Sequence, residues 1–117
     1  MSIGGDRVIV NSGTSCYGDT KRRKFERSTK AHNTVEIENQ SSSELWSEFR
    51  VGKRAKPVNL KIEKLSRGFL LDCAHLGYKN FFTGAIHRRK CELDQNILKI
   101  EDFISNKESF AVSRFIF

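Results

Sequence analysis

Long apolar runs, paired cysteines and the common catalytic motifs are all missing from this sequence. No stretch approaches the ~20 apolar residues of a membrane span, and residues 1–6 lack the basic and apolar regions of a secretory signal. The three cysteines, Cys16, Cys73 and Cys91, lie far apart without C-x-x-C spacing. This argues against a zinc knuckle and a full disulfide framework, so we expect buried free thiols and at most one disulfide. Phosphate-binding, dinucleotide-binding, G-x-S-x-G and H-E-x-x-H motifs are missing too, so the enzyme classes that they mark are not indicated.

Negative charge is also scarce. The 117 residues, enough for one domain, carry 21 Lys and Arg against 14 Asp and Glu, a net charge of +7. This excess favours a polyanionic partner, and charge alone leaves nucleic acid, anionic lipid and acidic polysaccharide open. The basic residues gather at 21–30, 50–61 and 87–90. One such block is often only a solvated surface, but three favour a shared anionic ligand. No aromatic residues interleave with them as in an RNA-recognition signature, which makes nucleic acid the weaker alternative.

The hydrophobic pattern predicts an all-β fold. There is one proline, and short runs with a period of two recur between polar or glycine-containing breaks. These runs lie at residues 7–10, 33–38, 45–51, 58–63, 69–74, 86–93, 97–104 and 110–117. About eight or more short strands indicate an antiparallel β-sandwich. Residues 14–31 are expected to form a long basic connection, and residues 42–49 are the only weak helix candidate. The chain opens and ends close to strands, as a piece of a longer protein would.

Residues 27–35 join the basic connection to a strand. On strand parity, Val35 and Ile37 face one side, while His32, Thr34 and Glu36 face the other. His32 is thus predicted to lie beside a cationic loop and away from the core. A lone histidine is more often structural than a ligand or base, so this placement makes His32 a candidate only.

Several blocks together resemble the C-terminal β-sandwich region of the heparinase II/III-like polysaccharide lyases. They are VIVNSGT followed by Tyr17, FERSTKAHNTV at 25–35, SELW at 43–46, FRVGKRA at 49–55, HLGY at 75–78 and HRR at 87–89. The resemblance covers nearly all of residues 1–117 and is most specific at AHNTV. It implies that the chain packs against an N-terminal (α/α) toroid, with a uronate-containing polysaccharide such as a heparin-like or alginate-like polymer bound between them. The implied reaction is β-elimination, in which the carboxylate is neutralised, a base removes the C5 proton and an acid protonates the leaving oxygen.

The resemblance also implies a metal position. In relatives that bind zinc, two ligands match Asn11 and His32, and further groups come from a His-rich segment that precedes residue 1. Asn11 departs from the usual Asp, and a neutral amide oxygen is a weaker zinc ligand than a carboxylate. Zinc is therefore expected in the full-length parent, and no cofactor in the isolated chain.

The remaining implied roles concern substrate. Tyr17 matches a tyrosine near the cleft that positions substrate or donates a proton, although packing of the long connection explains a tyrosine there equally well. Arg27, Lys53 and Arg54 are expected to bind the acidic sugar. The parent is expected in the periplasm or cell envelope, and the isolated chain is expected to be inactive. A non-catalytic polyanion-binding module and a mere scaffold with a solvated basic surface stay open as alternatives.

Overall fold

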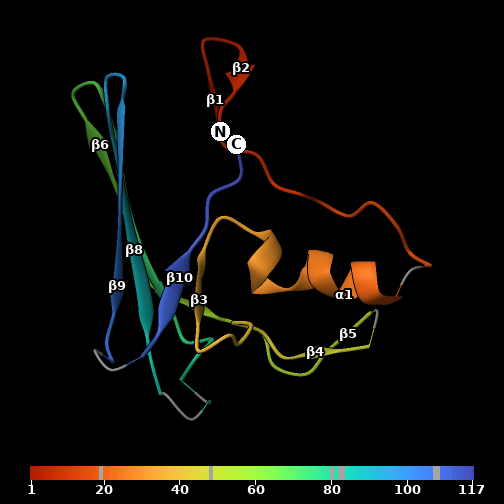
Figure 1. Ribbon diagram of the computed structural model, residues 1–117. Coiled ribbons are helices and arrows are strands. Elements are labelled where there is room, and N and C mark those ends of the chain that lie inside the picture. Colours follow the sequence, from red (N-terminus) through yellow and green to blue (C-terminus); the bar gives the residue numbers. More distant parts are fainter. Residues whose placement is uncertain (19, 48, 80, 82–83, 107–108) are drawn as a thin grey trace. The chain divides into compact units, whose positions relative to one another are not determined.

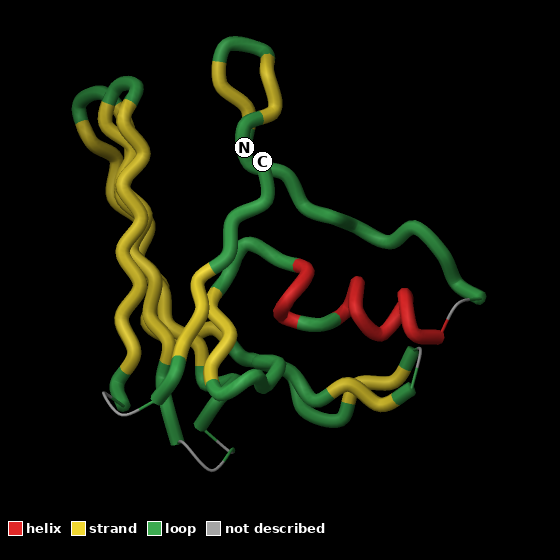
Figure 2. The backbone as a smooth tube through the Cα atoms, viewed as in Figure 1, coloured by secondary structure: helices red, strands yellow, loops and turns green. Residues whose placement is uncertain are grey.

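Short antiparallel strands are the main regular secondary structure of the protein (Figures 1 and 2). The computed structural model describes residues 1–18, 20–47, 49–79, 81, 84–106 and 109–117. They form two compact units: unit 1 combines Met1–Arg54 with Phe110–Phe117, and unit 2 is Ala55–Ser109. The predicted all-β class is confirmed. Among the described residues, no helix is long and apolar enough to cross a membrane.

Unit 2 is a four-stranded antiparallel sheet in which neighbours in sequence are neighbours in space. Its strands are β6 (Pro57–Leu65), β7 (Gly68–His75), β8 (His87–Asp94) and β9 (Ile97–Ile104). They coincide within a few residues with the predicted strands at 58–63, 69–74, 86–93 and 97–104. Period-two alternation located them because each strand has one apolar and one polar face.

The register of unit 2 places like side chains in rows. Ile62, Leu71, Cys91 and Ile100 are consecutive partners across the four strands and lie on one face. The other face carries ion pairs, such as the one in which Arg88 Nε donates to Asp72 Oδ1 at 2.7 Å. That bond to Arg88 holds the pKa of the buried Asp72 carboxyl below its usual value. The first face is apolar along this row, although Arg89 and Asp102 share it with Cys91 and Ile100.

Gly68 is required where β7 begins. A Cβ atom there would lie 1.7 Å from the Leu93 carbonyl oxygen, so only glycine lets β7 approach β8 this closely. The next hairpin turns at Gln95, which has a φ of 52°. Both turns lie between predicted strands, in the breaks at 64–68 and 94–96.

Unit 1 combines three two-stranded pairs with two helical segments. The pairs are β1 (Ser2–Ile3) with β2 (Asp6–Arg7), β3 (Val35–Ile37) with β10 (Ala111–Ser113), and β4 (Leu45–Trp46) with β5 (Arg50–Val51). The helical segments are α1 (Thr20–Arg27) and the 3-10 turn η1 (Thr29–Ala31). The small core of this unit includes Ala31, Val35 and Ile37, each at most 2% exposed.

Helix α1 corrects the prediction of an irregular connection over residues 14–31. Its inward side chains are Arg23, Glu26 and Arg27, while its one large apolar residue, Phe25, is exposed. The helix therefore has no apolar stripe with a 3.6-residue period, the pattern by which a sequence predicts an amphipathic helix. Its Lys, Arg and Glu residues are nevertheless good helix formers. The weak helix candidate at 42–49 is wrong, because it contains β4.

Three predicted strands differ from the structure. Of residues 110–117, only Ala111–Ser113 form a strand. Of residues 7–10, only Arg7 lies in a strand. Residues 45–51 form the β4–β5 hairpin instead of one strand, with Trp46 opposite Arg50. Glu48, within the predicted strand at 45–51, lies outside the described residues. All three cysteines are free, as expected, although they are partly exposed and not fully buried.

Candidate functional site

Residues 29–35 are held in place by bonds to three other segments of unit 1. The Thr29 N–H donates to Ser41 Oγ at 3.2 Å, and Thr29 Oγ1 accepts the Ser42 N–H at 2.9 Å. Asn33 donates its amide to the Val10 carbonyl at 2.5 Å and accepts the Ile116 N–H at 2.6 Å. Most polar side chains of this block thus serve the fold, and they fix the backbone on both sides of His32.

His32 lies at the end of η1, before β3 begins, so the strand parity used to orient it does not apply. Its Nδ1 lies 2.8 Å from Asn11 Oδ1, and the two residues are 21 positions apart in sequence. The amide oxygen is only an acceptor, so in the neutral imidazole Nδ1 carries the proton and Nε2 has the lone pair. The structure thus joins the two residues that the resemblance assigns to a metal position.

The donor set of this pair does not make a zinc site. Zinc sites in proteins use three or four protein ligands, mostly thiolate, imidazole and carboxylate. Here Asn11 offers a neutral oxygen that already accepts from His32. Among the described residues, no group of three or more His, Cys, Asp or Glu gathers around a common point. Asn11 is placed to orient the imidazole, which leaves Nε2 of His32 as the one strong metal ligand of the pair.

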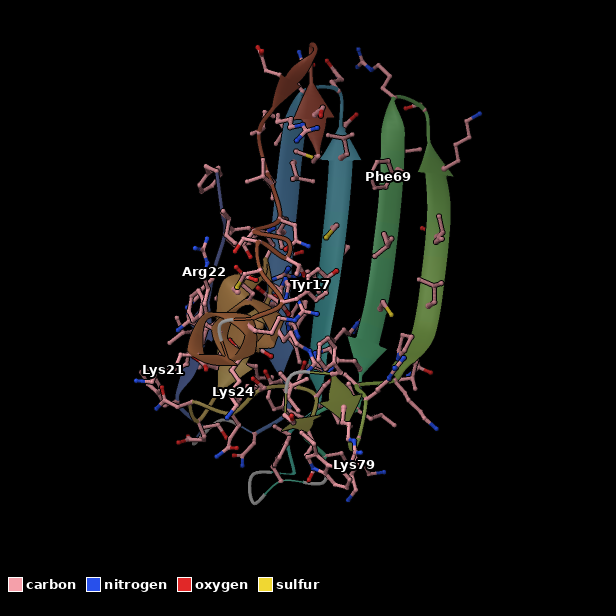
Figure 3. All side chains as sticks on the ribbon, turned by 90° about the vertical axis from the view of Figure 1, so that its right-hand side faces the viewer. Tyr17, Lys21, Arg22, Lys24, Phe69 and Lys79 are labelled. Atoms are coloured by element: carbon pink, nitrogen blue, oxygen red, sulfur yellow. The ribbon has the colours of Figure 1, made fainter. Side chains whose placement is uncertain are left out.

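Tyr17 belongs to an exposed aromatic pair. Its ring and that of Phe49 have centroids 6.4 Å apart and an angle of 10° between their planes. The Arg23 guanidinium carbon lies 5.0 Å from the Tyr17 ring centroid, and Arg23 Nη1 also donates to Thr14 Oγ1 at 2.7 Å. Figure 3 shows Tyr17 together with the charged side chains that project from α1.

A buried carboxylate supports the loop that carries Tyr17. Glu26 accepts the Ser15 N–H at 3.0 Å and the Ser15 hydroxyl, and Arg22 Nε lies 3.2 Å from it. The bonds from Ser15, followed by Arg22, lower the pKa of Glu26, although its burial opposes them. The ionised side chain therefore ties residues 14–17 to α1. This contact links Tyr17 to the helix that carries Arg23.

Arg27 joins α1 to the β4–β5 hairpin. Its Nη1 donates to the Ser47 carbonyl at 3.0 Å and its Nη2 to the Arg50 carbonyl at 3.2 Å. Figure 1 shows the helix alongside this hairpin. Lys53 and Arg54 follow the hairpin, and their side chains are exposed. Whether any of these three cations binds sugar stays a prediction, but Arg27 has a clear part in fixing the hairpin.

Glu36 is a second buried carboxylate of unit 1. It is 2% exposed, and it forms ion pairs with Arg114 Nη2 at 2.9 Å and Lys30 Nζ at 3.6 Å. Strand parity predicted Glu36 on a face away from the core, but the whole of β3 is buried. The Lys30 ammonium therefore partly compensates the charge of the buried Glu36 carboxylate.

Sequence reasoning missed a polar network in unit 2. His75 and His87 are register partners on β7 and β8, with Nε2 of His75 3.0 Å from Nδ1 of His87. His87 Nε2 lies 2.8 Å from Asp102 Oδ1, and Arg89 donates to both Asp102 oxygens at 2.7 and 2.8 Å. Only the strand register could reveal this arrangement, because these residues belong to three strands.

The hydrogen bond from Gly77 to His75 sets the tautomers of both histidines. Gly77 N–H donates to His75 Nδ1 at 3.2 Å, so the proton of neutral His75 is on Nε2 and points at His87. His87 then donates a hydrogen bond from its Nε2–H to Asp102 Oδ1. Burial, with the charges of His87 and Arg89 next, lowers the pKa of His75 to about 4. All four ring nitrogens have protein partners, so the network stabilises the sheet.

Trp46 and Phe49 are two further exposed aromatics that sequence reasoning did not single out as site residues. The Trp46 ring lies against Gly52, where a Cβ atom would be 2.7 Å from it, and its Nε1 donates to Glu44 at 2.8 Å. Both residues occur in the SELW and FRVGKRA blocks, and that was the only sequence signal for them.

A family model described as "Heparinase II/III-like, C-terminal" matches residues 1–115. No curated protein and no solved structure matches the chain. The match spans both units of the structure and all the residues considered above as site candidates.

Proposed function

The chain belongs to the heparinase II/III-like C-terminal family, and from this premise we propose that it is the β-strand part of a polysaccharide lyase. Its substrate class is an acidic polysaccharide that contains uronate, cut by β-elimination. The observation that carries the proposal is the family match over residues 1–115. The net charge of +7 supports an anionic substrate.

In this proposal unit 1 supplies part of the substrate surface. Tyr17 helps to position the sugar or gives a proton to the leaving oxygen, and Lys53 and Arg54 neutralise carboxylates. The exposed positions of these three residues are compatible with that role. Positive charge beside the C5 carboxylate makes the C5 proton easier to remove, because it stabilises the charge that develops in the transition state.

The Asn11–His32 pair would serve a metal position only with ligands from outside this chain. His32 Nε2 is the donor that this chain can contribute, oriented by the bond from Nδ1 to Asn11. The catalytic base is proposed to come from an (α/α) toroid in a longer parent protein. The isolated chain should accordingly bind the polymer without cutting it.

Binding of alginate and heparin oligosaccharides to the purified chain, measured calorimetrically at low and high salt, tests this proposal. We expect binding that weakens as salt rises, since screening acts on exposed charges. The variant Lys53→Glu/Arg54→Glu should lose roughly ten-fold in affinity at low salt, on the scale of exposed ion pairs. Lys64→Glu/Lys79→Glu makes the same change in net charge within unit 2 and should lose much less.

Ultraviolet absorbance of the unsaturated uronate product provides the second readout. Sustained formation of that product by the 117-residue chain would contradict the claim that essential groups lie elsewhere. Absence of oligosaccharide binding at low salt would contradict the proposed substrate class. Equal losses in the two double variants would show that total charge, and not the surface of unit 1, decides binding.

A further inference from the structure

Two aromatic rings of unit 1 are both exposed and lie close together. Tyr17 is 67% exposed and Phe49 is 65% exposed, yet their planes lie within 10° of each other. Exposed apolar surface carries a hydration cost. Neighbouring exposed apolar groups therefore often mark a binding surface.

Contacts from α1 fix the Tyr17 ring and the backbone beside Phe49. The Arg23 guanidinium carbon lies 5.0 Å from the Tyr17 ring centroid, and its Nη1 bond to Thr14 fixes the guanidinium. Arg27 binds the carbonyls of Ser47 and Arg50, the two described residues that flank Phe49. A surface fixed in this way loses little conformational freedom when a ligand settles on it.

Cations lie near the two rings, in space for Arg23 and in sequence for the others. Arg50 follows Phe49 directly, Lys53 and Arg54 are exposed three and four positions further on, and Arg23 covers part of Tyr17. The combination suits a ligand with one apolar face and a charged edge. A pyranose uronate has that form, because its axial C–H groups make an apolar face and its carboxylate projects from the ring edge.

We propose that Phe49 and the Tyr17 ring form a stacking surface for one pyranose ring of the acidic polysaccharide, with Arg23 and Arg27 as positioning residues. This inference rests on the proposed function and adds a sugar-binding role for Phe49. The C–H groups of the sugar lie against the electron-rich faces of the rings. The cations beside the rings pair with carboxylates of the same chain of sugars. Stacking fixes where the sugar lies, and charge attracts it.

Salt separates the stacking contribution from the ionic one. Phe49→Ala should weaken binding of alginate and heparin oligosaccharides by about five-fold, the scale of one aromatic contact, and by a similar factor at low and high salt. Phe49→Tyr should keep most of the affinity, because the ring remains. The loss in Lys53→Glu/Arg54→Glu should instead shrink as salt screens the charges.

Phe103→Ala is the matched control. Phe103 is 48% exposed in unit 2 and also has an arginine, Arg88, 5.7 Å from its ring centroid. Its loss should leave affinity unchanged, and circular dichroism should show that both alanine variants are folded. Unchanged affinity in Phe49→Ala, with weaker binding in Lys53→Glu/Arg54→Glu, would overturn the stacking surface and leave the proposed function standing. Failure of the unmodified chain to bind any oligosaccharide would overturn both.

Discussion

Acid should destabilise unit 2 well above the pH at which carboxylates are usually protonated. The cause is His75, whose ring is surrounded by His87, Gly77 and the Arg89–Asp102 pair. In the folded protein its pKa falls from 6.5 to about 4, whereas the unfolded chain keeps the ordinary value. Above pH 6.5 both states hold His75 neutral, so its contribution to stability is complete there.

The loss of stability grows as pH falls, because His75 binds a proton in the unfolded chain but not in the folded protein. Each pKa unit corresponds to about 1.4 kcal/mol, so the whole fall from 6.5 to about 4 amounts to about 3 kcal/mol. About 2.5 kcal/mol of this should be lost between pH 7.5 and 4.5. Below about pH 3 this group has no further effect.

Urea unfolding followed by far-ultraviolet circular dichroism, at a series of pH values, gives the free energy of unfolding. His75→Gln keeps an N–H that can reach His87 Nδ1, but it does not titrate. This variant should start less stable at pH 7.5 and lose about 2.5 kcal/mol less on acidification than the unmodified chain. The single tryptophan, Trp46, lies in unit 1 and gives a separate fluorescence signal for that unit. Equal pH dependence in both proteins would refute the reasoning.

Three more substitutions test the packing described above. Arg114→Met should cost about 3 kcal/mol in urea unfolding, because it leaves Glu36 buried with only the longer ion pair to Lys30; Lys30→Met should cost under about 1 kcal/mol, and a reversed order would contradict the assignment. Gly68→Ala should lower stability by about 3 kcal/mol or prevent folding, since its Cβ would clash with the Leu93 carbonyl. Gly18→Ala has open space and should be nearly neutral. Arg27→Met should cost about 1 kcal/mol and raise the mobility of the hairpin, measured as lower Trp46 fluorescence anisotropy; unchanged anisotropy would contradict the role of Arg27.

The sheet of unit 2 was predictable because each of its strands carries its own signal. Alternation of apolar and polar residues depends only on neighbours in sequence, and a two-sided antiparallel sheet produces it directly. The short segments of unit 1 were harder to locate. Helix α1 packs polar side chains such as Glu26 inward, and β3 is buried on both faces, so neither has the pattern expected for its type.

The sequence by itself determined the all-β class, the positive net charge and the family. Only the tertiary structure decided which residues act together. It joined His32 to Asn11 across 21 positions and placed Phe49 on Tyr17. It also linked His75 through His87 to Asp102. These contacts join segments far apart along the chain, and their geometry depends on strand register and on single bonds such as those of Arg27. Local propensity and residue spacing do not specify strand register or these single hydrogen bonds.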